Sequence, residues 1–179
     1  MNSEKTGIGG YDAAKHLMEE FLAQSPQRKS ELEAKVKAKG IVRALPFHVY
    51  PPIAIDSVPT FDSAVTQKPT AMLKARFDVA GRIVRFSEEW LAVNDMSQAM
   101  QTASVRATHD SHRRNWADSA PMRYSDAQLT LFAYRPNVRG DLVYLAWPSH
   151  DKEPEVWVYT GMQSEVFEDF IAYMKWLLA

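Results

Sequence analysis

The spacing of apolar residues over the first forty positions predicts two helices. A helix that Asp12 can cap carries one buried stripe at positions i, i+3, i+4, i+7 and i+8. The stripe consists of Ala14, Leu17, Met18, Phe21 and Leu22. Ser25-Pro26 then offers an N-cap followed by proline at the first helical position, where its missing N–H costs nothing. We therefore expect a second helix, thinly apolar and on the surface, that ends at Gly40.

The pattern changes after residue 44. Five prolines lie in residues 44–70, and they predict an irregular or edge-strand crossing because proline donates no hydrogen bond to a β-ladder. Residues 71–86 alternate apolar and polar positions, which predicts a β-hairpin with its turn at Ala80-Gly81. This region is therefore expected to supply strands and no helix.

The next forty residues are mixed in pattern. Ser87-Glu88-Glu89 resembles a helix start, because its carboxylates would lie at the positive end of the helix dipole. A helix is expected within residues 96–108, where alanine and methionine recur at helical spacing. The polar residues 108–124, which include a proline, are expected to form a loop.

The last fifty residues carry the clearest pattern. Ser164 is expected to cap a closing helix whose apolar face packs on a β-meander. The pattern predicts an α+β fold, with a twisted, mostly antiparallel sheet, flanking helices and a C-terminal amphipathic helix packed on the sheet. We expect residues 1–43 to form an N-terminal helical extension and residues 44–179 to form a single α+β domain. Short β-branched and aromatic runs predict the meander's strands at residues 129–134, 142–147 and 155–159.

Composition narrows the class of protein. The chain has 179 residues, of which 46% are apolar, enough for one hydrophobic core without metal or disulfide crosslinks. It has no cysteine, which excludes a disulfide framework, a thiolate nucleophile and cysteine metal sites. The net charge of −1 removes the main reason to expect direct binding of nucleic acid.

Charge is unevenly distributed along the chain. Residues 1–70 carry a net charge of +1 and residues 71–139 a net charge of +3. Residues 140–179 hold two lysines against seven carboxylates, which gives −5. The C-terminal quarter is therefore the acidic block, and it bears most on the choice of partner.

The N-terminal residues lack the apolar core of a signal peptide, and the chain has no run of about 18 apolar residues. We therefore expect a cytoplasmic protein that does not enter a membrane. The sequence leaves the oligomeric state open.

The densest polar cluster lies in residues 108–115. His109 and His112 could share a metal ion with Asp110, or a histidine with Arg113 could act on a phosphodiester as base and charge clamp. The alternative is a solvated loop whose histidines have no chemical role. Ser149-His150-Asp151-Lys152 holds triad residue types, but four consecutive residues cannot converge in triad geometry, so we interpret it as a turn.

Aromatic residues crowd the predicted meander. Alternate residues of a strand face opposite sides of the sheet, so Trp157 and Tyr159 oppose Val156 and Val158. One set belongs to the core, and the other is either an exposed aromatic face beside the acidic residues or covered by a helix or the N-terminal extension. Aromatic anchors within a charged rim are typical of protein-binding hot spots.

The closing segment resembles the end of the SUKH superfamily, which includes the fungal cell-wall-assembly regulators of the Smi/Knr type. The resemblance rests on a Gly-Asp strand of the Tyr-Leu-Ala type, a second strand with Val-Tyr, and a helix start of the Ser-Phe-Glu-Glu-Phe type. In this chain they are Gly140-Asp141-Leu-Val-Tyr-Leu-Ala-Trp147, Glu155-Val-Trp-Val-Tyr159 and Ser164-Glu-Val-Phe-Glu-Asp-Phe170. The resemblance covers residues 125–179. The family's early Leu-Pro signature survives only as Leu45-Pro46-Phe-His-Val-Tyr50, and Trp147-Pro148 replaces the usual Leu-Asp.

The resemblance implies an α+β domain and a protein-binding function without catalytic residues, metal or cofactor. Many bacterial members are immunity proteins that neutralise a cognate toxin or effector by direct binding, and an acidic face would speed their encounter with a basic toxin. The alternatives are a metal-dependent hydrolase or phosphodiesterase that uses His109, Asp110, His112 and Arg113, and a structural subunit of a larger assembly. We expect the partner-binding surface to consist of Asp141, Trp147, Asp151, Glu153, Glu155, Trp157 and Tyr159.

Overall fold

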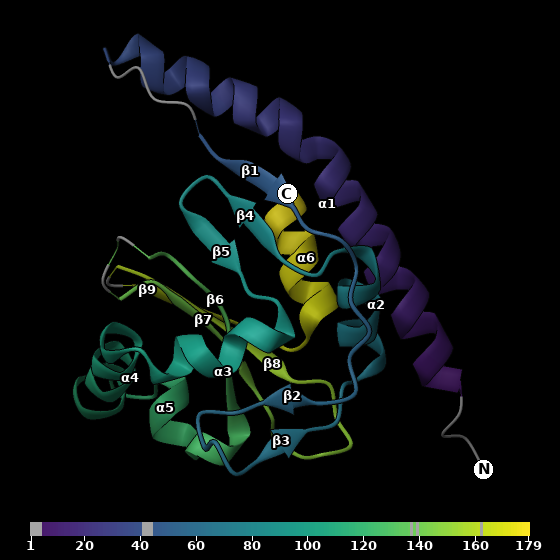
Figure 1. Cartoon of the computed structure of the whole chain (residues 1–179), viewed down its shortest axis with the longest axis vertical. Coiled ribbons are helices and arrows are strands. Elements are labelled where there is room, and N and C mark those ends of the chain that lie inside the picture. The colour runs from purple at the N-terminus through teal and green to yellow at the C-terminus, as the bar shows by residue number, and fades with distance from the viewer. Residues whose placement is uncertain (1–4, 41–44, 137, 139, 162) are drawn as a thin grey trace.

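The structure is a computed structural model that describes residues 5–40, 45–136, 138, 140–161 and 163–179. Seven strands of the described chain form one antiparallel sheet in the order β1-β4-β5-β6-β7-β8-β9 (Figure 1). A second sheet pairs β2 (Val58–Pro59) with β3 (Thr66–Gln67). The strands of the large sheet are β1 (Phe47–Val49), β4 (Ile83–Arg85), β5 (Glu88–Trp90), β6 (Leu129–Tyr134), β7 (Leu142–Ala146), β8 (Glu155–Thr160) and β9 (Gln163–Phe167).

Helices cover both faces of this sheet, so the predicted α+β fold is confirmed. The side chains of Trp90 and Tyr144 lie on opposite faces, as the strand register requires. Trp90 packs among rings of α1 and α6, whereas Tyr144 packs against His109 and His112 of α4. The helices are α1 (Lys5–Ala38), α2 (Ala71–Val79), α3 (Val93–Gln101), α4 (Ala103–Asn115), α5 (Ala120–Arg123), the 3₁₀ turn η1 (Asp126–Gln128) and α6 (Phe170–Leu178).

The N-terminal segment forms one long helix, so the prediction of two helices was wrong. Ser25 is buried, and its hydroxyl donates to the carbonyl of Phe21 at 2.7 Å, so it does not cap a new helix. Arg28 fixes the continuation, because its guanidinium reaches the carbonyls of Leu177 and Leu178 at the end of α6. Of the predicted stripe, Ala14, Met18 and Phe21 are buried in the main core, and Leu17 and Leu22 pack against it partly buried.

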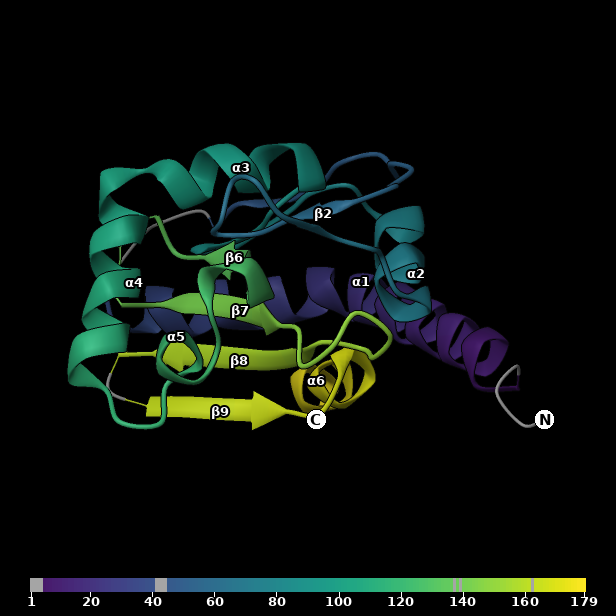
Figure 2. The ribbon, with the colours of Figure 1, turned by 90° about the horizontal axis from the view of Figure 1, so that it is seen from below.

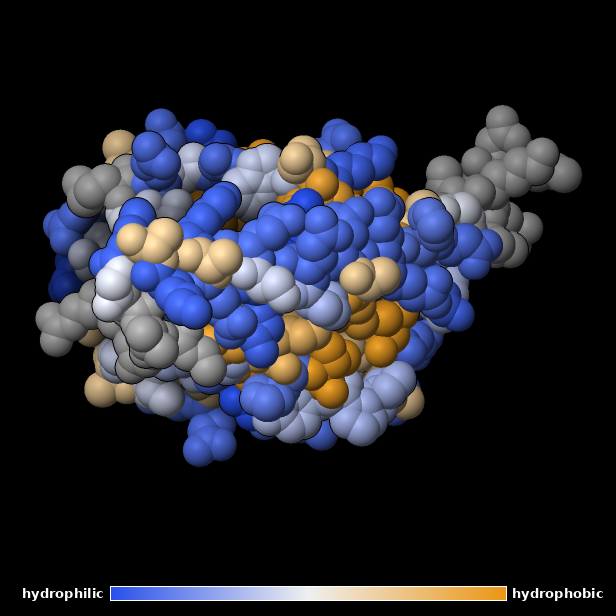
Figure 3. Space-filling model, turned by 90° about the horizontal axis from the view of Figure 1, so that it is seen from above, coloured by the Kyte–Doolittle hydropathy of each residue, from blue (hydrophilic) through white to orange (hydrophobic). Residues whose placement is uncertain are grey.

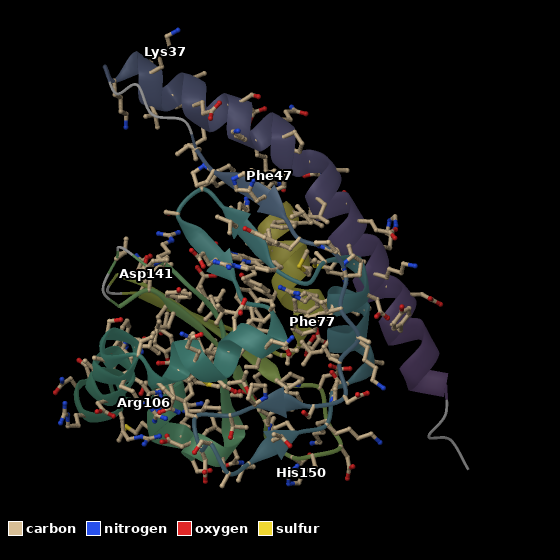
Figure 4. The ribbon with its side chains drawn as sticks, viewed as in Figure 1. Lys37, Phe47, Phe77, Arg106, Asp141 and His150 are labelled. Carbon is tan, nitrogen blue, oxygen red and sulfur yellow. The ribbon has the colours of Figure 1, made fainter. Side chains whose placement is uncertain are left out.

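The far end of α1 extends beyond the body of the fold, where Figure 4 shows Lys37. Figure 3 views the molecule from the side on which α1 lies, where hydrophilic side chains predominate and apolar ones show in patches between them. None of the described helices has the length and apolar content that crossing a membrane requires.

Residues 71–79 form the helix α2, so the predicted hairpin over residues 71–86 was wrong. Side-chain contacts favour the helix at both of its ends, one from a distant segment and one from α2 itself. A carboxylate oxygen of Glu153 accepts from the backbone N–H of Met72 at 3.2 Å, in the first turn of α2. Arg76 is fully buried and donates to the carbonyls of Ala80 and Gly81, just past the last turn. Figure 4 shows Phe77 of this helix in the interior.

Three further elements differ from the prediction. Glu88 and Glu89 begin a strand that pairs with β4 and β6, and residues 108–115 continue α4, whose buried valine and histidines face the core. Ser164 lies within β9, and Asp169 caps α6 by accepting from the N–H of Ala172 at 2.8 Å. The strands predicted at 129–134, 142–147 and 155–159 are confirmed as β6, β7 and β8, and β1 confirms an edge strand within residues 44–70.

Candidate protein-binding surface

The aromatic residues predicted to contact a partner are buried, so the expected exposed aromatic face was wrong. Trp147, Trp157 and Tyr159 are exposed by 1%, 4% and 1%. The Tyr159 ring stacks on His112 with centroids 4.4 Å apart, and its hydroxyl accepts from the N–H of Ala120 at 2.7 Å. The alternative, in which helices cover both faces of the meander, is therefore the one observed.

Trp147 and Asp141 also have structural contacts. The indole N–H of Trp147 donates to the Thr130 hydroxyl at 3.2 Å, inside the core. Asp141 is exposed by only 5%, and one carboxylate oxygen accepts from Arg135 at 3.0 Å. Its other oxygen accepts from the N–H of Gly161 at 2.7 Å, so Asp141 ties the β6–β7 connection to the β8–β9 turn. Figure 4 shows Asp141 at this end of the sheet.

The two half-buried glutamates of the predicted surface also have partners within the fold. Glu155 accepts from the Tyr124 hydroxyl at 3.0 Å and from the Trp157 indole at 2.8 Å. Burial and then this bond raise the pKa of Tyr124 to about 12. Glu153 caps α2, and burial raises the pKa of its carboxyl. Of the seven predicted contact residues only Asp151 is exposed, and its binding role stays a prediction.

The acidic block presents a different surface, at the border of the sheet that β9 forms (Figure 2). β9 pairs with β8 on one side, and no strand of the described chain pairs with its other side. Each of residues 163–166 is exposed. We define the β9 edge as Glu165, Val166, Glu168 and Trp176, all of which are exposed.

Apolar side chains flank the β9 edge on both faces of the sheet. Val166 is 49% exposed and lies opposite Trp157, on the face covered by α4 and α5. Trp176 is 43% exposed on the α6 face, and its ring centroid lies 5.2 Å from that of Phe167. Large exposed apolar groups beside an unpaired strand are typical of an interaction site.

The backbone of β9 leaves outward hydrogen-bonding groups. Two residues separate Thr160 from Gln163, and in such a hairpin the pair next to the loop is hydrogen-bonded. Pairs alternate along an antiparallel ladder, so the N–H and C=O groups of Ser164 and Val166 point away from β8. An extended segment can therefore pair with β9 at these two residues.

The stretch of sequence that contains β9 carries charge of one sign. Residues 153–174 hold five carboxylates and no lysine or arginine. Among them, Glu165 and Glu168 are exposed on the β9 edge. Such a field attracts cationic segments and speeds their encounter.

The histidines predicted as a possible metal or phosphodiester site lie on the buried side of α4. His109 is fully buried and His112 is 4% exposed, whereas Asp110 is exposed. No group of three or more histidine or acidic residues in the described chain converges as a metal site. The expected sharing of one ion by His109, Asp110 and His112 therefore has no geometric support.

His109 instead belongs to a structural cluster around Asp126 of η1. The carboxylate of Asp126 lies 3.0 Å from His109 Nε2 and 2.6 Å from the guanidinium of Arg113, and a second guanidinium, that of Arg106, lies 3.5 Å away. Burial lowers the pKa of His109 more than this carboxylate raises it, so the imidazole is held neutral. Arg106 is the member of this cluster that Figure 4 labels.

His112 lines a pocket of about 780 Å³ between α4 and the turns at Gly140 and Gly161. Its Nδ1 lies 3.3 Å from the Tyr144 hydroxyl. Burial lowers the pKa of His112 to about 4, which makes it a weak base at neutral pH. His112 is therefore uncharged at neutral pH.

Sequence reasoning missed the β9 edge because Ser164-Glu165 resembles a helix cap. A signal was present in Trp176, which lies outside the apolar stripe of Phe170, Met174 and Leu177 in a helix of period 3.6. A large apolar residue off the buried stripe indicates surface exposure. Comparisons of the chain with protein-family models, curated proteins and solved structures gave no match.

Proposed function

We propose that this chain is a non-enzymatic, cytoplasmic protein-binding protein, and that it is an immunity protein that neutralises a cognate bacterial toxin by direct binding. The surface that binds is the β9 edge. The partner presents an extended segment that contains lysine or arginine.

One observation carries this proposal: β9 is an exposed edge strand whose outer side pairs with no strand of the described chain, with apolar groups on both faces and carboxylates at its border. An added strand would gain backbone hydrogen bonds from Ser164 and Val166, as in recognition by β-augmentation. Because side chains alternate, its residues would contact Val166 on one face and Trp176 on the other. Glu165 and Glu168 then select cationic residues.

The acidic field gives the encounter its speed, and the apolar groups give the complex its lifetime. Electrostatic attraction acts mainly on the association rate, whereas desolvated aromatic anchors act mainly on dissociation. A toxin segment that is held against β9 is removed from its own substrate. The resemblance of residues 125–179 to the SUKH superfamily supports the same function.

The test uses the protein encoded beside this chain's gene as the partner. Cells that express that protein alone should stop growing, and co-expression of this chain should restore growth. The double variant E165K/E168K should associate with the partner at least about tenfold more slowly at low salt and should show a weaker salt dependence.

The control variant D56K/D110K makes the same change in net charge at exposed positions away from β9. It should keep the association rate of the natural chain. Equal slowing by both variants would show that only the net charge matters, and would refute a docking role for the β9 edge. Growth that this chain fails to restore, with no binding, would refute the immunity function.

A further inference from the structure

A small cavity lies on the α6 face of the sheet, between the β4–β5 hairpin, the β6–β7 turn and the last turn of α6. Its volume is about 220 Å³. This is smaller than sites for drug-sized ligands, which span about 300–1,000 Å³, so it suits a compact metabolite. The residues that matter for its chemistry are Arg85, Glu88, Arg135, Asp141, Tyr173 and Trp176.

Arg85 is the unusual group in this cavity. The Nε of Arg85 is buried and has no hydrogen-bond partner among the residues that the structure describes. No described carboxylate lies within ion-pair distance of its guanidinium, which is stacked 4.8 Å above the Phe21 ring. A buried donor without a partner is rare in folded proteins and calls for an explanation.

The carboxylates near Arg85 have other partners. Asp141 is bound by Arg135 and by the N–H of Gly161. Glu88 lies opposite Arg85 in the hairpin register, but it accepts from the Trp90 indole at 3.0 Å. Burial raises the pKa of Glu88, which favours its neutral form.

The carbonyls at the end of α6 also have a hydrogen-bond partner. Arg28 donates to the carbonyls of Leu177 and Leu178, so the negative end of this helix is compensated. Among the described residues of the cavity, Arg85 is therefore a cation without an ion-pair partner. The rings of Tyr173 and Trp176 form an apolar wall of the same cavity.

We propose that this cavity binds a small organic carboxylate, whose anionic group pairs with Arg85 and whose apolar part contacts Tyr173 and Trp176. A carboxylate matches the guanidinium because it can accept two parallel hydrogen bonds. Arg135 sits on the lining as a second donor. The cavity shares Trp176 with the β9 edge, whereas Arg85 lies outside that edge.

The probe is benzoate, and benzamide is its neutral counterpart of similar shape. The readout is the set of indole N–H signals in two-dimensional NMR, since Trp176 lines the cavity and the Trp90 indole donates to Glu88 of its lining. Benzoate should shift these signals in a saturable way, and benzamide should bind at least about tenfold more weakly. Equal affinities, or no saturable shift up to millimolar concentrations, would overturn the proposal.

Two arginine variants separate the cavity from nonspecific attraction. R85M should lower benzoate affinity at least about tenfold, whereas R114M, which removes an exposed arginine of α4, should leave it unchanged. Equal loss in both variants would refute a role for Arg85. If R85M fails to fold, as seen by circular dichroism, the comparison of benzoate with benzamide on the natural chain still decides.

Discussion

Replacing Arg76 with methionine tests how the structure ends α2. The guanidinium donates to the carbonyls of Ala80 at 2.5 Å, Gly81 at 2.8 Å and Leu91 at 3.3 Å. The side chain is fully buried and forms no ion pair with a carboxylate in the described chain. Burial lowers the pKa of Arg76 to about 9, so it stays charged at neutral pH.

The variant removes three hydrogen bonds and a buried charge. A buried acceptor left without a donor costs about 1–3 kcal/mol, so three carbonyls could cost about 3–9 kcal/mol in total. The long bond to Leu91 contributes least. The variant also no longer buries a charge without an ion-pair partner, and this gain offsets part of the loss. We expect R76M to lower the free energy of unfolding by about 3 kcal/mol.

The assay is urea unfolding followed by circular dichroism, with thermal unfolding beside it. A loss of this size corresponds to a fall in Tm of roughly 6–12 °C for a chain of this length. The control R114M should change stability by less than about 0.5 kcal/mol. A loss below about 1 kcal/mol in R76M would refute the assignment of Arg76 as the group that satisfies these carbonyls.

Three further changes test other parts of the fold. Burial lowers the pKa of His112 to about 4, so between pH 7 and pH 5 the unfolded chain takes up a proton at this residue and the folded chain does not. The free energy of unfolding should therefore fall by about 2 kcal/mol over this range. In urea unfolding, H112F should remove this part of the pH dependence. A Cβ on Gly81 would lie 2.4 Å from the Pro51 carbonyl oxygen, so G81A should lose at least about 2 kcal/mol, whereas G9A, with open space around its Cβ, should not lose stability. R28M should loosen α1 from α6 and lose about 1–2 kcal/mol in thermal unfolding, with the exposed K35M as control; equal stability of the two would contradict the contact of Arg28 with the end of α6.

The C-terminal strands could be predicted because local signals and tertiary structure agree there. β6, β7 and β8 are short runs of β-branched and aromatic residues bounded by glycine and proline, and each pairs with its neighbour in sequence. The fold class followed from the same pattern. Low separation along the chain is what makes such pairing readable from the sequence.

α2 could not be predicted from its own residues. Its alternation fits a strand, and the contacts that favour a helix form only in the folded chain: Glu153 lies more than seventy residues away, and Arg76 bonds carbonyls beyond the end of the helix. The predicted start of α6 was wrong for a local reason. Both Ser164 and Asp169 fit an N-cap, and the helix begins after Asp169. Because Ser164 pairs with Tyr159 of β8, it lies in a strand, and the helix begins at the later of the two candidate caps.

The site was misplaced because alternation says which residues share a face and does not say what covers that face. Trp157 and Tyr159 do share a face, as predicted. α4 and α5 cover that face, whereas the sequence predicted a loop for residues 108–124, which form most of these two helices. The C-terminal block is acidic, as predicted. Its exposed glutamates Glu165 and Glu168 lie at β9 and before α6, away from the predicted aromatic surface.

The most direct test of the proposed docking strand is amide hydrogen exchange in β9, with and without the protein encoded beside this chain's gene. In the free chain the outward N–H groups of Ser164 and Val166 should exchange quickly. In the complex, addition of a strand should slow both by at least about tenfold, while the exposed residues of α4 remain unchanged. Binding that leaves Ser164 and Val166 unprotected, with protection at another surface, would contradict the account.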